Sequence, residues 1–198
     1  NKILSKFVDK IFLGYAQAAA QLGSTNKTSF TGNPVRSSMF AVDKQQAYTH
    51  FGLDSAKKTL LVYGGSRGAR SINQAMLDFY KKADTFQTLQ IIHITGETDY
   101  QNVLEATAGL NLDKNSIKIY PYMHEMDQLL NITDLAVSRA GAIAIAEFLA
   151  LGIAAVLIPY PYATANHQEF NAQAVVDGRA GLMILDKDLS GEQLIEVL

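Results

Sequence analysis

The sequence predicts an α/β domain in which a parallel sheet is covered by helices on both faces. Three observations lead to this prediction. Short apolar runs alternate with stretches of helical periodicity along most of the 198 residues. Several runs are apolar throughout, which is typical of strands that are buried on both faces of a sheet. Two of the runs are followed directly by a glycine-containing turn and then by a helical pattern.

The expected strands and helices alternate in chain order. The strands are expected at 60–63, 89–94, 117–120, 135–138, 154–158 and 182–185. The helices are expected at 69–82, 99–108, 126–131, 142–151 and 168–177, with a last one after Ser190. The first of these helices places Ile72, Met76 and Phe79 on one apolar face. The helix at 142–151 is apolar almost throughout, so we expect it to be buried.

The first part of the chain follows a different pattern. Short strands at 11–13 and 28–30 flank an Ala-rich helix at 16–22, and Gly32-Asn33-Pro34 interrupts regular structure. We therefore expect 1–33 to be the tail of a preceding domain plus a linker, and 34–198 to be the main domain. The chain starts without Met and ends inside a helical pattern, so the sequence predicts a fragment of a longer protein.

Composition excludes several classes of function. A net charge of -2 argues against a nucleic-acid surface, which is usually clearly basic. Without cysteine there are neither disulfides nor thiolate metal sites, which fits the cytoplasm. The four histidines have no metal-site spacing, so we predict neither a metal nor a cofactor. Of these, His93 lies on an expected strand and is predicted to be structural, whereas His124 is predicted to be solvated in a loop.

The first candidate site is the turn Gly64–Ala69, between a strand and a helix. Glycines let the backbone turn sharply and approach a ligand closely. The free N–H groups of the following helix favour an anion, and Ser66 adds a hydroxyl donor. The turn therefore predicts phosphate binding; the alternative is a tight connection without a ligand.

The second candidate site is Ser138–Ala142, again between a strand and a helix. Gly141 leaves a second helix N-terminus open to an anion. Glu147 follows in an otherwise apolar helix, where a carboxylate is costly to bury without partners. It could hold a ribose diol, as acidic residues do in dinucleotide-binding folds. The alternative is that Glu147 pairs with Arg139 or with a surface residue.

The third candidate site is Asn166–Asn171, at the start of a helix after a Pro-rich loop. Neutral amides offer both donors and acceptors to sugar hydroxyls. The alternative is that Asn166 only caps the helix.

Taken together, these motifs resemble the MurG family, the bacterial N-acetylglucosaminyltransferases of peptidoglycan synthesis. The resemblance spans nearly the whole chain. Its matching strings are Thr31–Arg36, Gly64–Ala69, His93–Gly96, Tyr122–Met126, Arg139–Ala142 with Glu147, and Asn166–Gln168 with Asn171. That family has the GT-B architecture of two Rossmann-like domains with a cleft between them, and this chain resembles the C-terminal, donor-binding half.

The resemblance also implies a set of contacts to a UDP-sugar. The implied contact residues are Arg36, Gly65, Ser66, Gly68, Met123, Arg139, Gly141, Ala142, Glu147, His167 and Gln168. The glycine turns would surround the diphosphate, Glu147 would take the ribose, the backbone of Met123 would read the uracil, and His167 and Gln168 would hold the sugar. Two positions depart from the family pattern: His167 stands where Gln is frequent, and Ala144 where Thr is frequent. The family's catalytic base lies upstream, so no catalytic residue is expected in this chain.

The implied reaction transfers N-acetylglucosamine from UDP-N-acetylglucosamine to a lipid-linked muramyl-pentapeptide, with inversion and without a metal. The implied location is the cytoplasmic side of the bacterial membrane, in peripheral contact with it. Two alternatives stay open, namely a related GT-B glycolipid glycosyltransferase and a non-catalytic UDP-sugar-binding module. A dinucleotide-dependent dehydrogenase is disfavoured, because the GxGxxG fingerprint is missing.

Overall fold

A computed structural model describes residues 3–16, 18–22, 26–82 and 88–198 of the chain. Its centre is a six-stranded sheet in which every pairing is parallel, with strand order β5-β4-β3-β6-β7-β8. The strands are β3 (Lys58–Tyr63), β4 (Leu89–Ile94), β5 (Ile117–Tyr120), β6 (Leu135–Ser138), β7 (Ala154–Leu157) and β8 (Gly181–Met183). The predicted α/β class and all six predicted strands are confirmed; β4, β5 and β6 have the predicted bounds, and the ends of β3, β7 and β8 differ by one or two residues.

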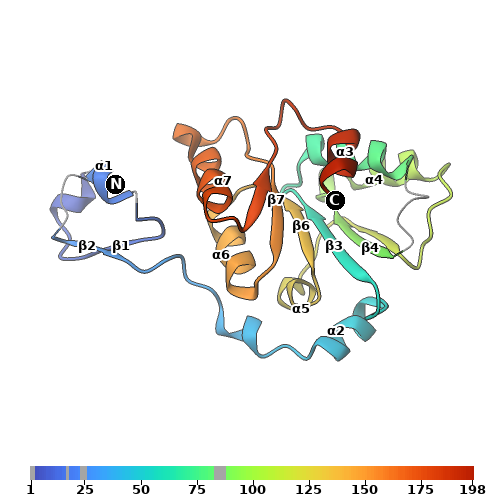
Figure 1. The fold of residues 1–198 in the computed structure, drawn as a ribbon, viewed down its shortest axis with the longest axis horizontal. Coiled ribbons are helices and arrows are strands. Elements are labelled where there is room, and N and C mark those ends of the chain that lie inside the picture. The colour runs from blue at the N-terminus through green and yellow to red at the C-terminus, as the bar shows by residue number, and fades with distance from the viewer. Residues whose placement is uncertain (1–2, 17, 23–25, 83–87) are drawn as a thin grey trace.

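Helices cover both faces of this sheet, as predicted (Figure 1). They are α2 (Lys44–Phe51), α3 (Arg70–Tyr80), α4 (Glu97–Thr107), α5 (Met126–Asn131), α6 (Ala142–Leu151), α7 (His167–Asp177) and α8 (Gly191–Val197). Among the described residues, no helix is both long and apolar enough to cross a membrane.

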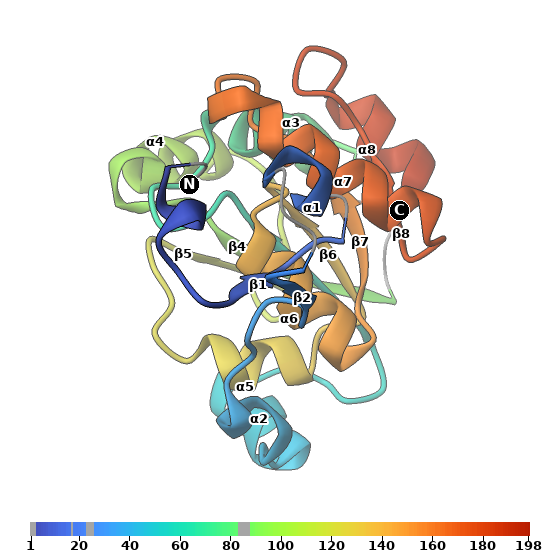
Figure 2. The same cartoon turned by 90° about the vertical axis from the view of Figure 1, so that its left-hand side faces the viewer.

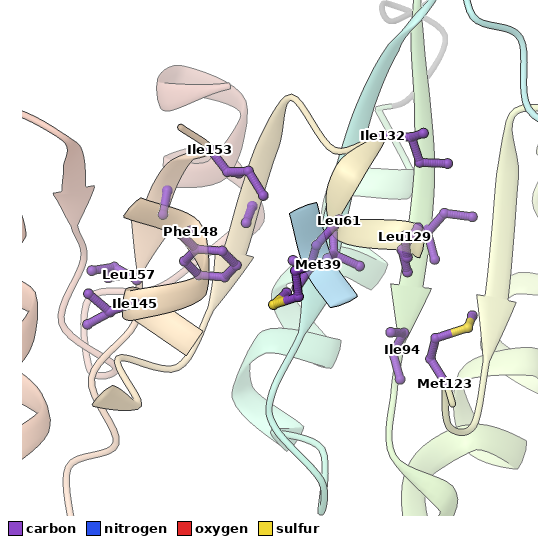
Figure 3. Close-up of a cluster of buried hydrophobic side chains, with 14 of the residues drawn as sticks. Met39, Leu61, Ile94, Met123, Leu129, Ile132, Ile145, Phe148, Ile153 and Leu157 are labelled. Atoms are coloured by element: carbon purple, nitrogen blue, oxygen red, sulfur yellow. The ribbon is translucent and has the colours of Figure 1, made fainter. Parts of the chain in front are cut away.

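Alternate residues of the central strand pack on opposite faces, because side chains alternate along a strand. Leu61 packs with residues of α2, α5, α6 and α7, in the cluster that Figure 3 shows. Leu60 and Val62 pack instead with residues of α3 and α8. Figure 2 shows α2 beside α5, and both helices contribute residues to the cluster that contains Leu61. Both faces of the sheet are therefore apolar, and this is why its strands show no polar alternation.

The helices differ from the sequence-based expectations in two ways. The expected helices did not include α2, which follows Asp43, whose carboxylate accepts hydrogen bonds from the N–H groups of Gln45 and Gln46. The helix α6 was expected to be buried, but Ile143 and Leu149 on its outer side are 54% and 53% exposed. A helix that is apolar all round does not reveal in its sequence which side faces the sheet.

The described residues before Pro34 include a second, smaller sheet. The strands β1 (Ile11–Leu13) and β2 (Thr28–Phe30) pair in parallel with each other and do not join the larger sheet. The expected helix at 16–22 is present as α1 (Ala18–Leu22); its residue 17 lies outside the described residues. Figure 1 shows this smaller sheet apart from the main body, connected by an extended segment. The domain boundary at 33/34 itself stays a prediction.

Candidate functional site

The site lies where the sheet reverses its winding direction. From β3 the chain moves outward through β4 to β5, and from β6 it moves the opposite way through β7 to β8. At such a switch point, the loops after the two central strands separate and leave a crevice at their carboxyl ends. The turn after β3 is Gly64–Ala69, and the turn after β6 is Arg139–Gly141. The structure therefore brings the first two predicted sites to one crevice.

The turn after β3 needs its glycines for two different reasons. Gly65 and Gly68 have φ angles of 91° and 73°, in the left-handed region that favours glycine. A Cβ at Gly68 would also collide with the carbonyl of Thr95, whereas no described atom lies within 4 Å of a Cβ at Gly65. The space beside Gly65 is thus open toward the crevice. In the described structure no side chain caps α3 at Ala69, so its first N–H groups remain available to a ligand.

The turn after β6 has a different geometry. Gly141 stands directly before α6 with a φ of -70°, an angle that any residue can adopt. No described atom lies within 4 Å of a Cβ at this position. Its contribution is therefore open space in front of α6 rather than an unusual conformation.

Two hollows adjoin these turns. The larger, of about 630 Å³, is lined by residues 63–71, Arg139, Gly141, Ala144, residues 160–162, Gln168 and Asp186. The smaller, of about 140 Å³, is lined by Ile94, Pro121, Tyr122, Met123 and Met126. Tyr63, Gly65 and Ser66 line both hollows. Of the predicted residues, the first turn, Arg139, Gly141 and Gln168 meet at the larger hollow, and Met123 lies at the smaller.

Met123 contributes its side chain to the apolar core, where Figure 3 shows it near Ile94. It is only 7% exposed. The contact of its backbone with a ligand, which the family resemblance implies, stays a prediction.

Glu147 lies in the second turn of α6, and its side chain is 15% exposed. Burial raises the pKa of its carboxyl group, while the nearby Arg36 guanidinium acts in the opposite direction. A guanidinium nitrogen of Arg36 lies 4.0 Å from Glu147 Oε1, and the side chain of Arg36 is 63% exposed. Such a long, exposed contact leaves carboxylate oxygens open to other donors. The alternative of a pair with Arg139 is wrong, but the alternative of a surface partner describes Arg36 in part.

Arg139 lines the larger hollow but directs its donors into the protein. Its side chain is 12% exposed and forms an ion pair with Asp186. It also donates to the Ser71 hydroxyl at 2.9 Å and to the carbonyls of Ile158 and Pro159 at 3.3 Å. Through these contacts Arg139, just after β6, connects the end of β7, the start of α3 and the loop after β8. Sequence reasoning missed Asp186, whose only signal was an acidic side chain just after a strand.

Of the third predicted site, Gln168 lies at the larger hollow and His167 does not line it. Gln168 lines the larger hollow and accepts a hydrogen bond from the Tyr160 N–H at 3.0 Å. His167 is exposed, and its Nδ1 lies 2.8 Å from the Thr164 carbonyl. The alternative of a cap by Asn166 is wrong, because its side chain donates to Glu169 instead, at 2.6 Å.

A buried polar chain lies beneath the first turn. The Tyr80 hydroxyl lies 3.1 Å from His93 Nδ1, and His93 Nε2 lies 3.0 Å from Asn73 Oδ1. Asn73 in turn donates to the Thr95 carbonyl at 3.0 Å, next to Gly68. Burial lowers the pKa of His93 to about 3, against a smaller opposing effect of Asp99. His93 is therefore structural, as predicted.

His124 is exposed and its ring lies against that of Tyr122, which also agrees with the prediction of a solvated loop. Within the described ranges, no group of three His, Asp or Glu side chains is placed to hold a metal ion.

Comparison with known proteins places these features in context. The family model described as the glycosyltransferase family 28 C-terminal domain matches residues 59–198. Two similar curated proteins are named UDP-N-acetylglucosamine--N-acetylmuramyl-(pentapeptide) pyrophosphoryl-undecaprenol N-acetylglucosamine transferase. They come from Desulforamulus reducens (42% identical) and Bacillus subtilis (41% identical), and in both the match covers 100% of this chain and 54% of the relative. The chain thus spans about half the length of these relatives.

A similar solved structure is that of Acinetobacter baumannii MurG. It is 23% identical, with a TM-score of 0.73, over 98% of this chain and 52% of that one. At this identity the likeness concerns the fold, and it agrees with the predicted C-terminal half of a GT-B architecture.

Proposed function

Since the chain belongs to the glycosyltransferase family 28 C-terminal domain, we propose that it is the donor-binding domain of an inverting N-acetylglucosaminyltransferase. Its donor is UDP-N-acetylglucosamine, and the acceptor is a lipid-linked muramyl-pentapeptide of peptidoglycan synthesis. The names of the curated relatives support both substrates. The acceptor is held mainly by the other half of the enzyme, which works at the cytoplasmic face of the membrane in peripheral contact with it.

One observation carries this proposal: the N-termini of α3 and α6 open onto the same crevice. A helix N-terminus presents unpaired N–H groups and a partial positive charge to an anion. Two of them suit the two phosphates of UDP. Gly65, Ser66 and Gly68 precede α3, and Gly141 precedes α6, which begins at Ala142. When the sugar leaves, negative charge grows on the diphosphate, and fixed N–H dipoles stabilise it without reorganisation.

The positions of the two hollows support the contacts of Met123 and Gln168, and the family resemblance supports those of Glu147, Arg36 and His167. The smaller hollow takes the uracil at the backbone of Met123, and the larger takes the diphosphate and the sugar. Glu147 accepts hydrogen bonds from the ribose, with Arg36 beside it. Gln168 faces the sugar, and His167 lies next to it at the rim. Arg139 acts indirectly, because its ion pair with Asp186 holds the loops that surround the phosphates.

We expect this chain to bind UDP and UDP-N-acetylglucosamine without transferring the sugar, because the catalytic base belongs to the other half. Isothermal titration with both nucleotides, with GDP as a control for the size of the base, measures the binding. A transfer assay with the lipid-linked acceptor measures turnover. Transfer by this chain alone would show that it holds the catalytic group. Two alternatives are a related glycolipid glycosyltransferase and a non-catalytic UDP-sugar module. Under either alternative, the complete protein would not transfer the sugar to this acceptor.

A further inference from the structure

A side-chain hydrogen bond connects the N-terminus of α3 with the segment that leads into α6. Ser71 is the second residue of α3, which begins at Arg70. Arg139 lies three residues before Ala142, where α6 begins. A guanidinium nitrogen of Arg139 donates to the Ser71 hydroxyl at 2.9 Å. The two helix starts that open onto the crevice are therefore linked directly.

Asp186, in the loop after β8, is the common acceptor of this pair. The Ser71 hydroxyl donates to Asp186 Oδ1 at 2.6 Å, and Arg139 forms an ion pair with the same oxygen. The hydroxyl thus donates its only proton to one partner and accepts from the other. The side chains of Arg139 and Asp186 are 12% and 21% exposed, so water screens this cluster less than it screens a surface ion pair.

The cluster faces the larger hollow without adding net charge to it. Ser71, Arg139 and Asp186 all line that hollow, and the charges of the last two cancel. Arg139 is held further by the carbonyls of Ile158 and Pro159, each at 3.3 Å. Because its guanidinium group is engaged within the protein, the cluster affects a bound anion through the position of the two helices.

Apolar packing does not align these two helix starts. The helix α3 packs on one face of the sheet and α6 on the other, so they share no apolar core. Hydrogen bonds from N–H groups to an anion are short, about 2.7–2.9 Å, and the effect of a helix N-terminus falls off within the first turn. Two helix starts can therefore bind one diphosphate only at a fixed spacing, and the polar cluster supplies the direct link that maintains it.

We propose that Ser71 is a positioning residue of the nucleotide site. Its hydroxyl, held by Arg139 and Asp186, fixes the spacing between the N-termini of α3 and α6 that suits two phosphates. This inference rests on the proposed function and adds to it a residue that acts through the two helices. Loss of this hydroxyl should lower the affinity for ligands that carry phosphates and leave the affinity for the nucleoside unchanged.

The test is Ser71→Ala, which removes the hydroxyl without changing the charge. Isothermal titration measures the affinity for UDP and for uridine, which has no phosphates. We expect Ser71→Ala to weaken UDP binding about three- to tenfold and to leave uridine binding unchanged, whereas Ser71→Thr, which keeps a hydroxyl, should restore it. Gln74→Ala, at an exposed position of the same helix, is the matched control and should bind both ligands normally. Equal losses for UDP and uridine would show a merely structural role and would overturn the inference.

Asp186→Asn tests the same link from the acceptor side, because it removes the charge that pairs with Arg139. We expect weaker UDP binding. In the double variant with Ser71→Ala, the loss should be smaller than the product of the two single losses, since both act through Arg139. Tighter UDP binding by Asp186→Asn would show that the released Arg139 binds phosphate directly, and would overturn the positioning role. Asp188→Asn makes the same charge change at an exposed position of the same loop and is the control.

Thermal melting of every variant confirms that it is folded before its affinity is compared. If Asp186→Asn is unfolded, Ser71→Ala alone decides the inference. If the unsubstituted chain binds UDP and Ser71→Ala binds it equally well, only this inference fails. If the unsubstituted chain does not bind UDP, the proposed function fails as well.

Discussion

Glu147 illustrates how a single side chain can be unfavourable for the fold and favourable for binding. It lies in an apolar helix with one long contact to Arg36, and burial raises its pKa. At neutral pH its charge therefore costs stability in the unliganded chain. Ribose hydroxyls would supply the donors that this carboxylate lacks. The cost that Glu147 adds to folding is then offset when the nucleotide binds.

Replacing Glu147 by Ala should weaken UDP binding by roughly 1–3 kcal/mol, the scale of hydrogen bonds to a charged acceptor. Binding of 2′,3′-dideoxy-UDP, which offers no ribose hydroxyls to the carboxylate, should change much less. Titration of both ligands measures the difference. Glu147→Gln is the matched control: because the folded pKa is raised, removing the charge should increase the melting temperature at neutral pH. Equal losses for the two ligands would show that Glu147 acts only on the structure.

At the scale of elements, the order of strands and helices and the buried face of α3 could be predicted from the sequence, but the exposed side of α6 could not. The apolar runs and the glycine turns lie close together in sequence, and this is enough to place β3, α3, β6 and α6. The helix α2 was missed because only Ala47 and Phe51 of its residues are buried, which is too few to establish a helical period.

Within the candidate site, the residues of the two glycine-containing turns could be predicted, while Asp186 could not. The partner of Asp186 is Arg139, which lies 47 residues away in the chain. Arg139 was predicted as a ligand contact, and its engagement with Asp186 is likewise a tertiary fact. Short-range patterns carry no information on such contacts.

The turn after β3 can be tested through Gly65. A side chain there meets no described atom, but it would be strained at a φ of 91° and would occupy the space beside the crevice. We expect Gly65→Val to reduce affinity for UDP at least tenfold more than affinity for uridine, which has no phosphates. Titration with both ligands gives the ratio, and a thermal melt confirms that the variant is folded. Gly141→Ala, at an unstrained angle, is the matched comparison. Proportional losses for uridine and UDP in a folded Gly65→Val variant would mean that this turn does not bind phosphate.

At the scale of the whole molecule, the buried chain around His93 links the stability of the sheet to pH. The pKa of His93 is about 3 in the folded chain, below its ordinary value of about 6.5. The unfolded chain therefore binds one more proton between these values. The stability from a neutral His93 is complete above pH 6.5 and is lost as the pH falls toward 3.

This linkage predicts a loss of about 1.4 kcal/mol in the free energy of unfolding for each pH unit below 6.5. Urea unfolding at pH 7.5, 6.0 and 5.0 measures the slope. In His93→Gln this contribution should disappear, so the pH dependence of unfolding becomes flatter by that amount. His124→Gln, at an exposed ring, should keep the original slope. If both variants keep it, His93 is not the group that takes up the proton.

The close approach of Gly68 to the Thr95 carbonyl also bears on how a nucleotide is captured. Asn73 donates to that same carbonyl, so the backbone beneath the turn is held from below before any ligand arrives. The conformational entropy of this segment is lost when the chain folds and not when the nucleotide binds. Association through this turn then requires little ordering of the protein, and less of the interaction energy is spent on immobilising it. Under this arrangement, residence time depends on the contacts themselves rather than on the opening of a loop.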